Sequence, residues 1–463
     1  MALRVLATSL AIVLLGLLAF AISGRLLYPF ELEWMEGATA VHVSRLLDGR
    51  GIYVRPSLDF VPFGYPVLYY YACLPVAWIV GSGLTALRIV SIIATIVTLV
   101  TVYLIVRPHS GGAAGLVAVG AFAGAYPLSD GWYDLGRVDA LYVSLLSGVY
   151  LASIRAKGAS GWVLCGALAA AAFTTKQPAV LALAPLILYL LFTNWRNALV
   201  FGATFAVLAA LVFLAVNETS DGWYRYFTVD IPRWRMAVSP RGRGLSFWTM
   251  DLMPVLPAVV AGAAIVVIMR EWRHAAMAVG LIGAAWLARL EGGAWNNAVM
   301  PAYLAAAVLL GLSLRQDFPG CRWRWSLTVC QLAVLMYDPR PFRPTPADLA
   351  KGSALVDQLR TSEKPVLLMN NGYWATAAGL PEHAHGWAVT DVVWADKGEA
   401  GRALERDVAL AIRNRHFSTI IEDGGQSWFR RDLETHYRPV RQIDSPPLRS
   451  GAPRQPAVAL ERR

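Results

Sequence analysis

Residues 84–106 read LTALRIVSIIATIVTLVTVYLIV, and Arg88 is the only charged residue in this stretch. An α-helix needs about 20 consecutive apolar residues to cross the hydrocarbon core of a bilayer. Further apolar blocks lie at about 4–24, 64–81, 112–128, 137–155, 161–176, 178–193, 196–216, 251–270, 273–290, 295–314 and 324–337. The sequence therefore predicts a polytopic α-helical membrane protein.

The composition points the same way. Of the 463 residues, 56% are hydrophobic and 16% are charged, whereas soluble domains carry about a quarter charged residues. The formal net charge of +10 would suggest a nucleic-acid partner in a soluble protein, but here Arg and Lys collect in short loops between apolar blocks. We therefore expect membrane lipids, and no nucleic acid, as partners. The spacing of the four cysteines indicates neither a metal site nor a disulfide framework.

The basic loops predict the orientation in the membrane. The loops after residues 106, 155, 193, 270 and 314 carry Arg107, Arg155 with Lys157, Arg196, Arg270 with Arg273, and Arg315 with Arg322 and Arg324. The positive-inside rule makes these loops cytoplasmic, which requires the block at 64–81 to stay in the outer leaflet. This predicts about eleven crossings of the inner (cell) membrane. The first outer loop (about 25–83) and everything after residue 337 are then extracytoplasmic.

The chain after the last apolar block has a different character. In residues 338–443, predicted helices at 346–360 and 402–415 alternate with short apolar strands at 365–369 and 417–421. This alternation is typical of a small α/β domain. Residues 444–463 are rich in Pro, Arg and Ser and are predicted to form a disordered tail. We expect a transmembrane domain (1–337), an extracytoplasmic α/β domain (338–443) and this tail.

Three carboxylates, Glu31, Glu33 and Glu36, follow the first apolar block. If the segment is helical, Glu33 and Glu36 share a face, because residues three apart are neighbours on a helix. Such a pair suits proton transfer or ligand binding. An equally weighted alternative is a solvated helix start, where acidic residues favour the N-terminal dipole.

A second charged segment, Asp134, Arg137 and Asp139, lies between two apolar blocks on the same predicted face. These residues could pair only structurally at a helix start. Ionisable groups at the membrane edge are costly unless they pair or line a wet cavity, which favours a functional site. Two acidic loops on one face could position a general base.

Four more polar residues are candidate substrate ligands on this face. Lys176 and Gln177 separate two apolar blocks, and Glu291 and Asn296 flank a Gly pair in a later outer loop. An isolated lysine at the membrane edge commonly snorkels to the interface. Lys176 could instead bind a lipid phosphate as a point charge.

The order of these features resembles a known superfamily. One span, an acidic outer loop, the aromatic segment FGYPVLYY (63–70), a helix containing Leu87 and Arg88, and a second Asp-containing loop follow one another. Over about residues 1–315 the chain resembles the GT-C superfamily of integral membrane glycosyltransferases. It is most similar to bacterial relatives of the protein O-mannosyltransferases and the lipid A aminoarabinose transferases (glycosyltransferase family 39-like).

The resemblance implies an enzyme that moves a hexosyl or pentosyl group from a polyprenyl-phosphate donor to an acceptor hydroxyl of a glycan, lipid or protein outside the membrane. The general base falls on Glu36 or Glu33, the second-loop acids on Asp134 and Asp139, and the phosphate ligands on Arg137 and Lys176. Many relatives carry an Asp-Glu pair where this chain has Met35 and Glu36. The choice between the two glutamates therefore stays open. No cofactor is certain, and a divalent metal is an open alternative with no ligand assigned.

Two other classes of protein fit the hydropathy. A polytopic transporter or lipid flippase would carry internal repeats and charges near the bilayer midplane, whereas the charges here lie in loops and no repeat is evident. A non-catalytic assembly protein would use the C-terminal domain to recruit a partner.

Overall fold

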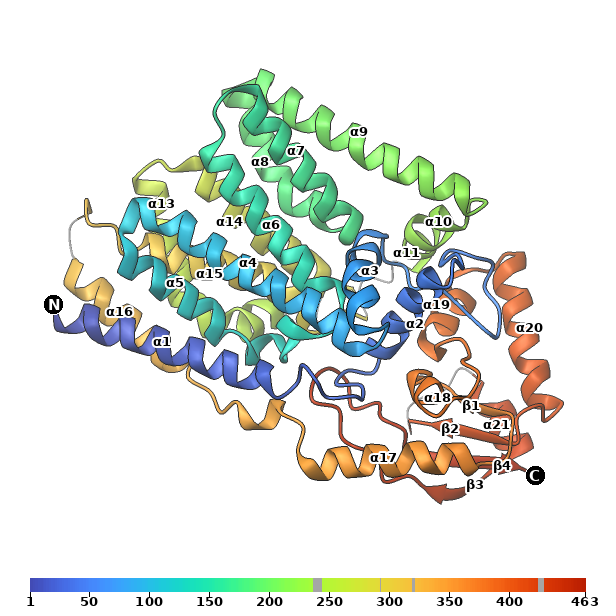
Figure 1. The fold of residues 1–463 in the computed structure, drawn as a ribbon. Coiled ribbons are helices and arrows are strands. Elements are labelled where there is room, and N and C mark those ends of the chain that lie inside the picture. The colour runs from blue at the N-terminus through green and yellow to red at the C-terminus, as the bar shows by residue number, and fades with distance from the viewer. Residues whose placement is uncertain (236–243, 292, 319–320, 424–428) are drawn as a thin grey trace.

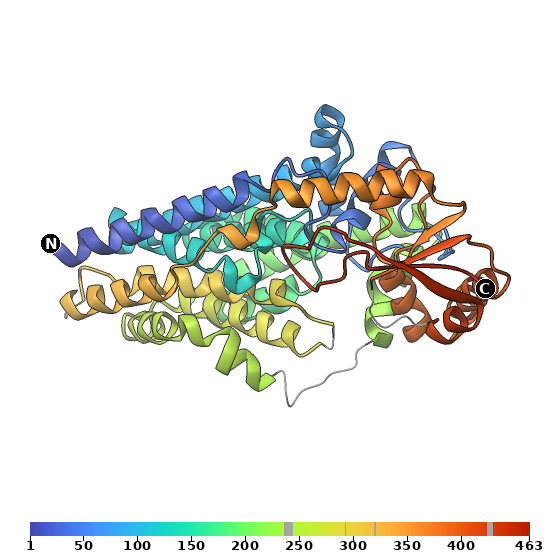
Figure 2. The same cartoon turned by 90° about the horizontal axis from the view of Figure 1, so that it is seen from below.

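The computed structural model describes residues 1–235, 244–291, 293–318, 321–423 and 429–463. Most of the chain up to residue 337 forms a bundle of long helices (Figures 1 and 2). Its helices are α1 (Ala2–Ser23), α4 (Leu84–Ser110), α5 (Gly112–Gly124), α6 (Val138–Arg155), α7 (Gly158–Thr175), α8 (Ala179–Thr193), α9 (Trp195–Thr219), α13 (Leu256–Ile268), α14 (Trp272–Arg289), α15 (Met300–Leu312) and α16 (Cys321–Val334).

Within the described ranges, six helices are long and apolar enough to cross a membrane, or seven if the bent pair of helices at 244–268 is counted as one span. Helix α3 (Leu68–Val80) is one of the shorter apolar helices, with α8 and the segment 296–312. The predicted polytopic helical fold is confirmed. The total of about eleven crossings stays a prediction.

Small residues let the helices approach closely. A Cβ atom on Gly280 of α14 would meet the carbonyl oxygen of Ala182 in α8, and one on Gly262 of α13 would meet Leu309 in α15. Transmembrane helices associate through such contacts, because lipid supplies no hydrophobic driving force between them.

Residues of the predicted cytoplasmic loops gather at one end of the bundle. Arg155 donates to the Leu104 carbonyl oxygen (3.2 Å), Arg273 to the Ser153 carbonyl oxygen (3.1 Å), and Arg315 to Glu271 (2.8 Å). These contacts bring four of the five basic loops together, as strict alternation of the helices requires.

The opposite end of the bundle carries the first loop and several short helices. These are α2 (Glu36–Leu47), α3, η2 (Trp132–Asp134), α10 (Trp223–Arg225), η3 (Tyr226–Asp230), α11 (Ile231–Arg235) and η6 (Asn296–Val299). The C-terminal part of the chain lies beyond this end, far from Met1 (Figures 1 and 2).

The C-terminal part is the predicted α/β unit. Its helices are α17 (Pro346–Thr361), α18 (Tyr373–Ala377), α19 (Gly386–Ala395), α20 (Glu399–Arg413) and α21 (Arg430–His436). Strands β1 (Val366–Leu368), β2 (Thr419–Glu422), β3 (Tyr437–Gln442) and β4 (Val458–Arg462) form one sheet in the order β1-β2-β4-β3. Strands β1 and β2 are parallel, and the other pairs are antiparallel.

The first loop anchors this unit to the bundle. The ring of Phe30 stacks on that of Trp374 at 4.6 Å, and Gly352 of α17 leaves room for Phe30, which a Cβ atom there would meet. One hydrophobic cluster includes residues of the bundle together with Leu355, Leu359 and Val366. The domain division at residue 337 stays a prediction, because this core continues across it.

The predicted disordered tail is wrong. Residues 458–462 form β4, which lies between β2 and β3 and pairs with both. The composition of residues 444–463 indicated disorder because Pro and Arg are frequent there. Only Val458, Ala459 and Leu460 supply apolar side chains to the strand. The preceding residues reach the bundle: Ser450 and Arg449 donate backbone hydrogen bonds to the Leu32 carbonyl oxygen at 3.0 and 2.9 Å.

Truncation after residue 443 should therefore destabilise the protein, because it removes an inner strand of the sheet and the contacts of Ser450. We expect a clear fall in melting temperature in detergent or nanodiscs relative to the full chain. Removal of Arg463 alone, which leaves β4 complete, is the control. A truncated chain that melts like the full one would contradict the placement of β4.

Candidate functional site

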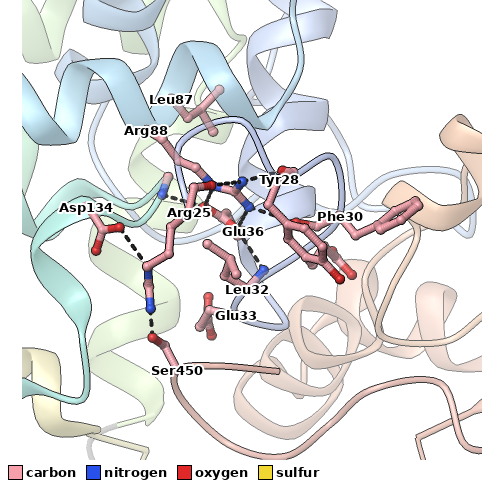
Figure 3. Close-up of polar contacts among 12 residues, drawn as sticks. Arg25, Tyr28, Phe30, Leu32, Glu33, Glu36, Leu87, Arg88, Asp134 and Ser450 are labelled. Carbon is pink, nitrogen blue, oxygen red and sulfur yellow. Dashed lines mark hydrogen bonds and ion pairs between the residues drawn. The ribbon is translucent and has the colours of Figure 1, made fainter. Parts of the chain in front are cut away.

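A buried ion pair between Arg88 and Glu36 organises the first loop (Figure 3). The guanidinium of Arg88 donates from Nε to Glu36 Oε1 (2.8 Å) and from Nη2 to Oε2 (2.7 Å). Both side chains are 0% exposed. Because α4 supplies the arginine and α2 begins at Glu36, this pair fixes where α2 starts relative to the bundle.

The remaining donors of Arg88 hold the backbone of the first loop. Nη1 donates to the carbonyl oxygens of Arg25 (3.0 Å) and Tyr28 (2.5 Å), and Nη2 donates to that of Phe30 (2.8 Å). A guanidinium has five N–H donors, and here each of the five has an acceptor. Arg88 therefore acts as the structural centre of residues 25–36.

Glu36 has no acceptor capacity left. Besides Arg88, the backbone N–H of Gly136 donates to Oε1 (2.8 Å) and that of Leu32 donates to Oε2 (3.0 Å). A carboxylate offers about four lone-pair sites, and all are used. Burial raises the pKa of Glu36, but Arg88 and the backbone donors outweigh it and hold the pKa below its ordinary value. This carboxylate is placed to tie the two loops together.

Glu33 differs because one of its oxygens is unused. Oε2 accepts from Arg137 Nη1 (2.7 Å) and from the Met35 N–H (3.1 Å). Oε1 is buried and has no hydrogen-bond partner among the described residues. Burial raises the pKa of Glu33 to about 7, although Arg137 acts against that rise. A carboxyl that titrates near neutral pH and carries an unused oxygen is chemically competent for proton transfer.

Glu31 is the third acidic residue of the first loop. Its side chain is buried and accepts a hydrogen bond from Asn371 Nδ2 at 3.1 Å. Burial raises the pKa of Glu31 well above its ordinary value, and that hydrogen bond only partly opposes the rise. Glu31 Oε1, like Glu33 Oε1, is buried without a hydrogen-bond partner among the described residues. The pKa of about 7 therefore separates Glu33 from Glu31.

Asp134 joins three parts of the chain through Arg25. Arg25 Nε donates to Asp134 (2.7 Å), and its Nη2 donates to the Gly131 carbonyl oxygen (3.0 Å) and to Ser450 Oγ (3.1 Å), as Figure 3 shows in part. The hydroxyl of Tyr126 donates to the other oxygen of Asp134 (2.9 Å). This arrangement locks the second loop to the C-terminal segment.

Asp139 instead holds the amine of Lys176, with Nζ to Oδ1 at 2.6 Å. Asn297 Nδ2 and Trp132 Nε1 also donate to Asp139, each at 3.0 Å. The side chain of Lys176 is 14% exposed, against 1% for its partner, so the amine lies at the edge of the buried network. Next to it, Arg137 Nη2 donates to the Tyr65 hydroxyl at 3.1 Å.

The structure thus brings Glu33, Arg137, Asp139, Lys176 and Tyr65 into one neighbourhood, which we call the polar cluster. Arg137 connects its two halves, because the charges of Glu33 and Asp139 both raise the pKa of its guanidinium.

The other predicted ligands lie around this cluster. Gln177 donates to the carbonyl oxygens of Gly64 (2.7 Å) and Thr228 (3.2 Å) and so positions the aromatic segment 63–70. Glu291 is exposed beyond the end of α14, and Asn296 begins η6. Its neighbour Asn297 is the residue that contacts Asp139.

Sequence reasoning missed the roles of Arg25, Tyr65, Asn297 and Asn371. A signal did exist for Arg88, since a lone charge in a span is costly unless a partner is present. For the other residues the sequence carries no such signal, because their partners lie far away in the chain. In the described part of the chain, no group of three or more His, Cys, Asp or Glu residues is placed to hold a metal ion.

The fold is that of a polytopic helical membrane protein. Comparisons with known proteins show what it is similar to. Residues 65–220 match the family model described as dolichyl-phosphate-mannose-protein mannosyltransferase. The crystal structure of ArnT from Cupriavidus metallidurans bound to undecaprenyl phosphate has a TM-score of 0.64, with 12% sequence identity and 98% of both chains covered. Oligosaccharyltransferase AglB from Archaeoglobus fulgidus, in complex with an inhibitory peptide and a dolichol-phosphate, gives a TM-score of 0.51 at 12% identity, covering 88% of this chain and 69% of that one.

Two curated proteins that are similar to part of this chain are named as arabinosyl transferases. The chain is 28% identical over 299 residues to the undecaprenyl phosphate-alpha-4-amino-4-deoxy-L-arabinose arabinosyl transferase of Pseudomonas aeruginosa (strain UCBPP-PA14), covering 58% of this chain and 52% of the relative. The protein of the same name from Edwardsiella ictaluri (strain 93-146) is 27% identical over 219 residues, covering 43% and 39%. The chain thus spans about half the length of these relatives or less. The predicted resemblance to the GT-C superfamily is confirmed.

Glu36→Gln should destabilise the protein, because it leaves the buried charge of Arg88 without its counter-ion. Removing one partner of a buried pair costs about 3–5 kcal/mol, which should appear as a large fall in melting temperature. The control is Asp48→Asn, whose partner Arg50 is 55% exposed, so that its effect should stay within about 0.5 kcal/mol. Equal melting of both variants would rule out a structural role for Glu36.

Proposed function

We propose that this protein is a membrane glycosyltransferase that moves a sugar from a polyprenyl-phosphate donor to an acceptor hydroxyl on the outer face of the inner membrane. The family match over residues 65–220 and the ArnT-like fold support the reaction class. The observation that carries the assignment to residues is the free, buried oxygen of Glu33, whose other oxygen binds Arg137.

Glu33 is the proposed general base. Its Oε1 accepts the proton of the acceptor hydroxyl while the hydroxyl oxygen attacks the anomeric carbon of the donor sugar. The bond from that carbon to the phosphate oxygen breaks, and the polyprenyl phosphate leaves with the bonding electron pair. A pKa near 7 suits this role, because a base works best when its pKa lies near the operating pH. Glu36, with its four accepted hydrogen bonds, is the less suitable of the two candidates.

Lys176 and Arg137 are the proposed ligands of the leaving phosphate. Lys176 is partly exposed and is held by a single carboxylate, Asp139. Arg137 contacts Glu33 through Nη1, and its Nε atom is buried without a partner among the described residues. Phosphate oxygens are the natural acceptors for such donors. Stabilising the charge that develops on the leaving group is usually a large part of catalysis.

The position of the polar cluster supports a reaction at the outer face. The cluster lies at the end of the bundle opposite the gathered basic loops, which the positive-inside rule places in the cytoplasm. In a transporter, by contrast, charged sites sit near the middle of the membrane, between helix repeats. The charged groups of the polar cluster come from loops and helix ends at one face, which favours the transferase.

Glu33→Gln should lower the rate of sugar transfer by about 10²–10⁴-fold, the usual contribution of a general base, while polyprenyl phosphate still binds. The matched control is Glu31→Gln, because burial raises the pKa of Glu31 well above its ordinary value and so favours the neutral carboxyl, which a neutral amide of the same shape replaces. Its rate should stay within about threefold of the unmodified protein. The assay follows transfer from radiolabelled polyprenyl-phosphate sugars, and full activity of Glu33→Gln would reject this base.

The transfer rate should also depend on pH through Glu33. The base must be ionised, and the pKa of Glu33 is raised to about 7. The kcat/KM should therefore rise with pH up to about neutrality and fall roughly tenfold for each unit below it. Glu31→Gln should keep this profile. A profile that stays flat from about pH 5.5 to 8 would show that another group takes the proton.

A further inference from the structure

A cleft in the C-terminal α/β unit has the composition of a ligand site. Its cavity volume is about 70 Å³, it lies at the ends of β1 and β2, and its polar lining includes Asn370, Thr390, Glu422, Asp423 and Arg454. Ligand pockets in proteins pair an apolar lining with a few placed polar groups. In α/β sheets, ligands bind beyond the carboxyl ends of parallel strands, and β1 and β2 are the parallel pair of this sheet.

An aromatic side chain lines the cleft beside its polar groups. Trp387 of α19 lines it, and the Arg454 guanidinium carbon lies 6.0 Å from the centre of the Trp387 ring. Asp423 accepts hydrogen bonds from Asn370 (2.8 Å) and Arg454 (3.3 Å). An indole face beside amide, carboxylate and guanidinium groups matches a pyranose ring, which presents C–H bonds on one face and hydroxyl groups around its rim.

The charges select among sugars. Two carboxylates, Glu422 and Asp423, line the cleft against one guanidinium, Arg454. This excess of negative charge would repel a phosphate or uronate group. It would not repel an uncharged sugar, and it would attract the ammonium group of an amino sugar. The cleft is therefore suited to a pyranose without an anionic group.

Trp34, which follows Glu33 in the sequence, contacts the lining of the cleft. The ring of Trp34 packs edge-to-face against that of Trp387 at 5.5 Å. The guanidinium carbon of Arg454 lies 5.3 Å from the centre of the Trp34 ring. Leu58 of the first loop also lines the cleft, and its carbonyl oxygen accepts from the Ala384 N–H at 2.9 Å. A molecule held here lies against the loop that carries the proposed base.

We propose that this cleft binds a non-anionic pyranose unit of the acceptor, remote from the hydroxyl that receives the new sugar. The identity of that ligand as the acceptor rests on the proposed function, but its binding needs no turnover. The site would then select glycan or glycolipid acceptors and hold them against the first loop.

The test measures binding of sugars to the full chain in nanodiscs without any donor. The probes are methyl α-D-glucopyranoside, methyl α-D-mannopyranoside and glucosamine, with glucuronate and glucose 6-phosphate as anionic counterparts. At least one of the first three should bind and should slow backbone hydrogen exchange in residues 366–370 and 384–390. Tighter binding of an anionic probe, or no slowing in either segment with any of the first three probes, would overturn the proposal.

Substitutions then localise the binding. Asp423→Asn and Trp387→Ala should each weaken the best probe at least about fivefold, as expected for the loss of a buried polar or aromatic contact. The matched control Glu434→Gln, which changes an exposed acid paired with Arg430, should bind as the unmodified protein does. Unchanged binding by Asp423→Asn would contradict the site, even if Trp387→Ala fails to fold. The binding test uses no donor and needs no turnover. Its result therefore stays valid even if Glu33 is not the general base.

Discussion

The fully buried pair of Arg88 and Glu36 is the interaction on which the site depends. Burying two charges costs more than their attraction returns unless every donor and acceptor is satisfied. Here that condition is met, since Arg88 uses its five donors and Glu36 its four acceptor positions. The pair therefore gives the first loop a single conformation at the end of the bundle, which is a requirement for placing reactive groups accurately.

The rest of the site follows from this anchor. Glu36 reaches Gly136 and so fixes the second loop against the first. Arg25 then joins Asp134 to Ser450, which brings the C-terminal segment over both loops. Within this frame Glu33 is forced into a buried position where only one of its oxygens is used. Its raised pKa is a consequence of that burial, and the proposed chemistry uses it.

Much of the fold could be predicted from the sequence, because hydropathy and charge are local signals. The apolar block containing Arg88 became α4, and the predicted helix at 346–360 corresponds to α17 (Pro346–Thr361). Strand β4 could not be foreseen, since the pairing with β2 that stabilises it joins residues far apart in the chain. Local composition reports what a segment prefers alone, whereas an inner strand is stabilised by its neighbours.

The candidate site was predictable as a set of residues but not as a set of roles. The sequence singles out Glu33, Glu36, Asp134, Asp139, Arg137 and Lys176, because charges at the membrane edge are unusual. Their partners decide their roles, and Arg88 lies 52 positions from Glu36. Spacing alone therefore cannot separate a carboxylate saturated by hydrogen bonds from one with an unused oxygen.

The most direct test of this division of roles is an experimental structure of the full chain with polyprenyl phosphate bound. We expect the phosphate oxygens to contact Lys176 or Arg137, with Glu33 Oε1 facing the phosphate and Glu36 still bound to Arg88. A phosphate bound by Arg88, with Glu36 released into the site, would contradict the assignment of Glu33 as the base and of Glu36 as the anchor.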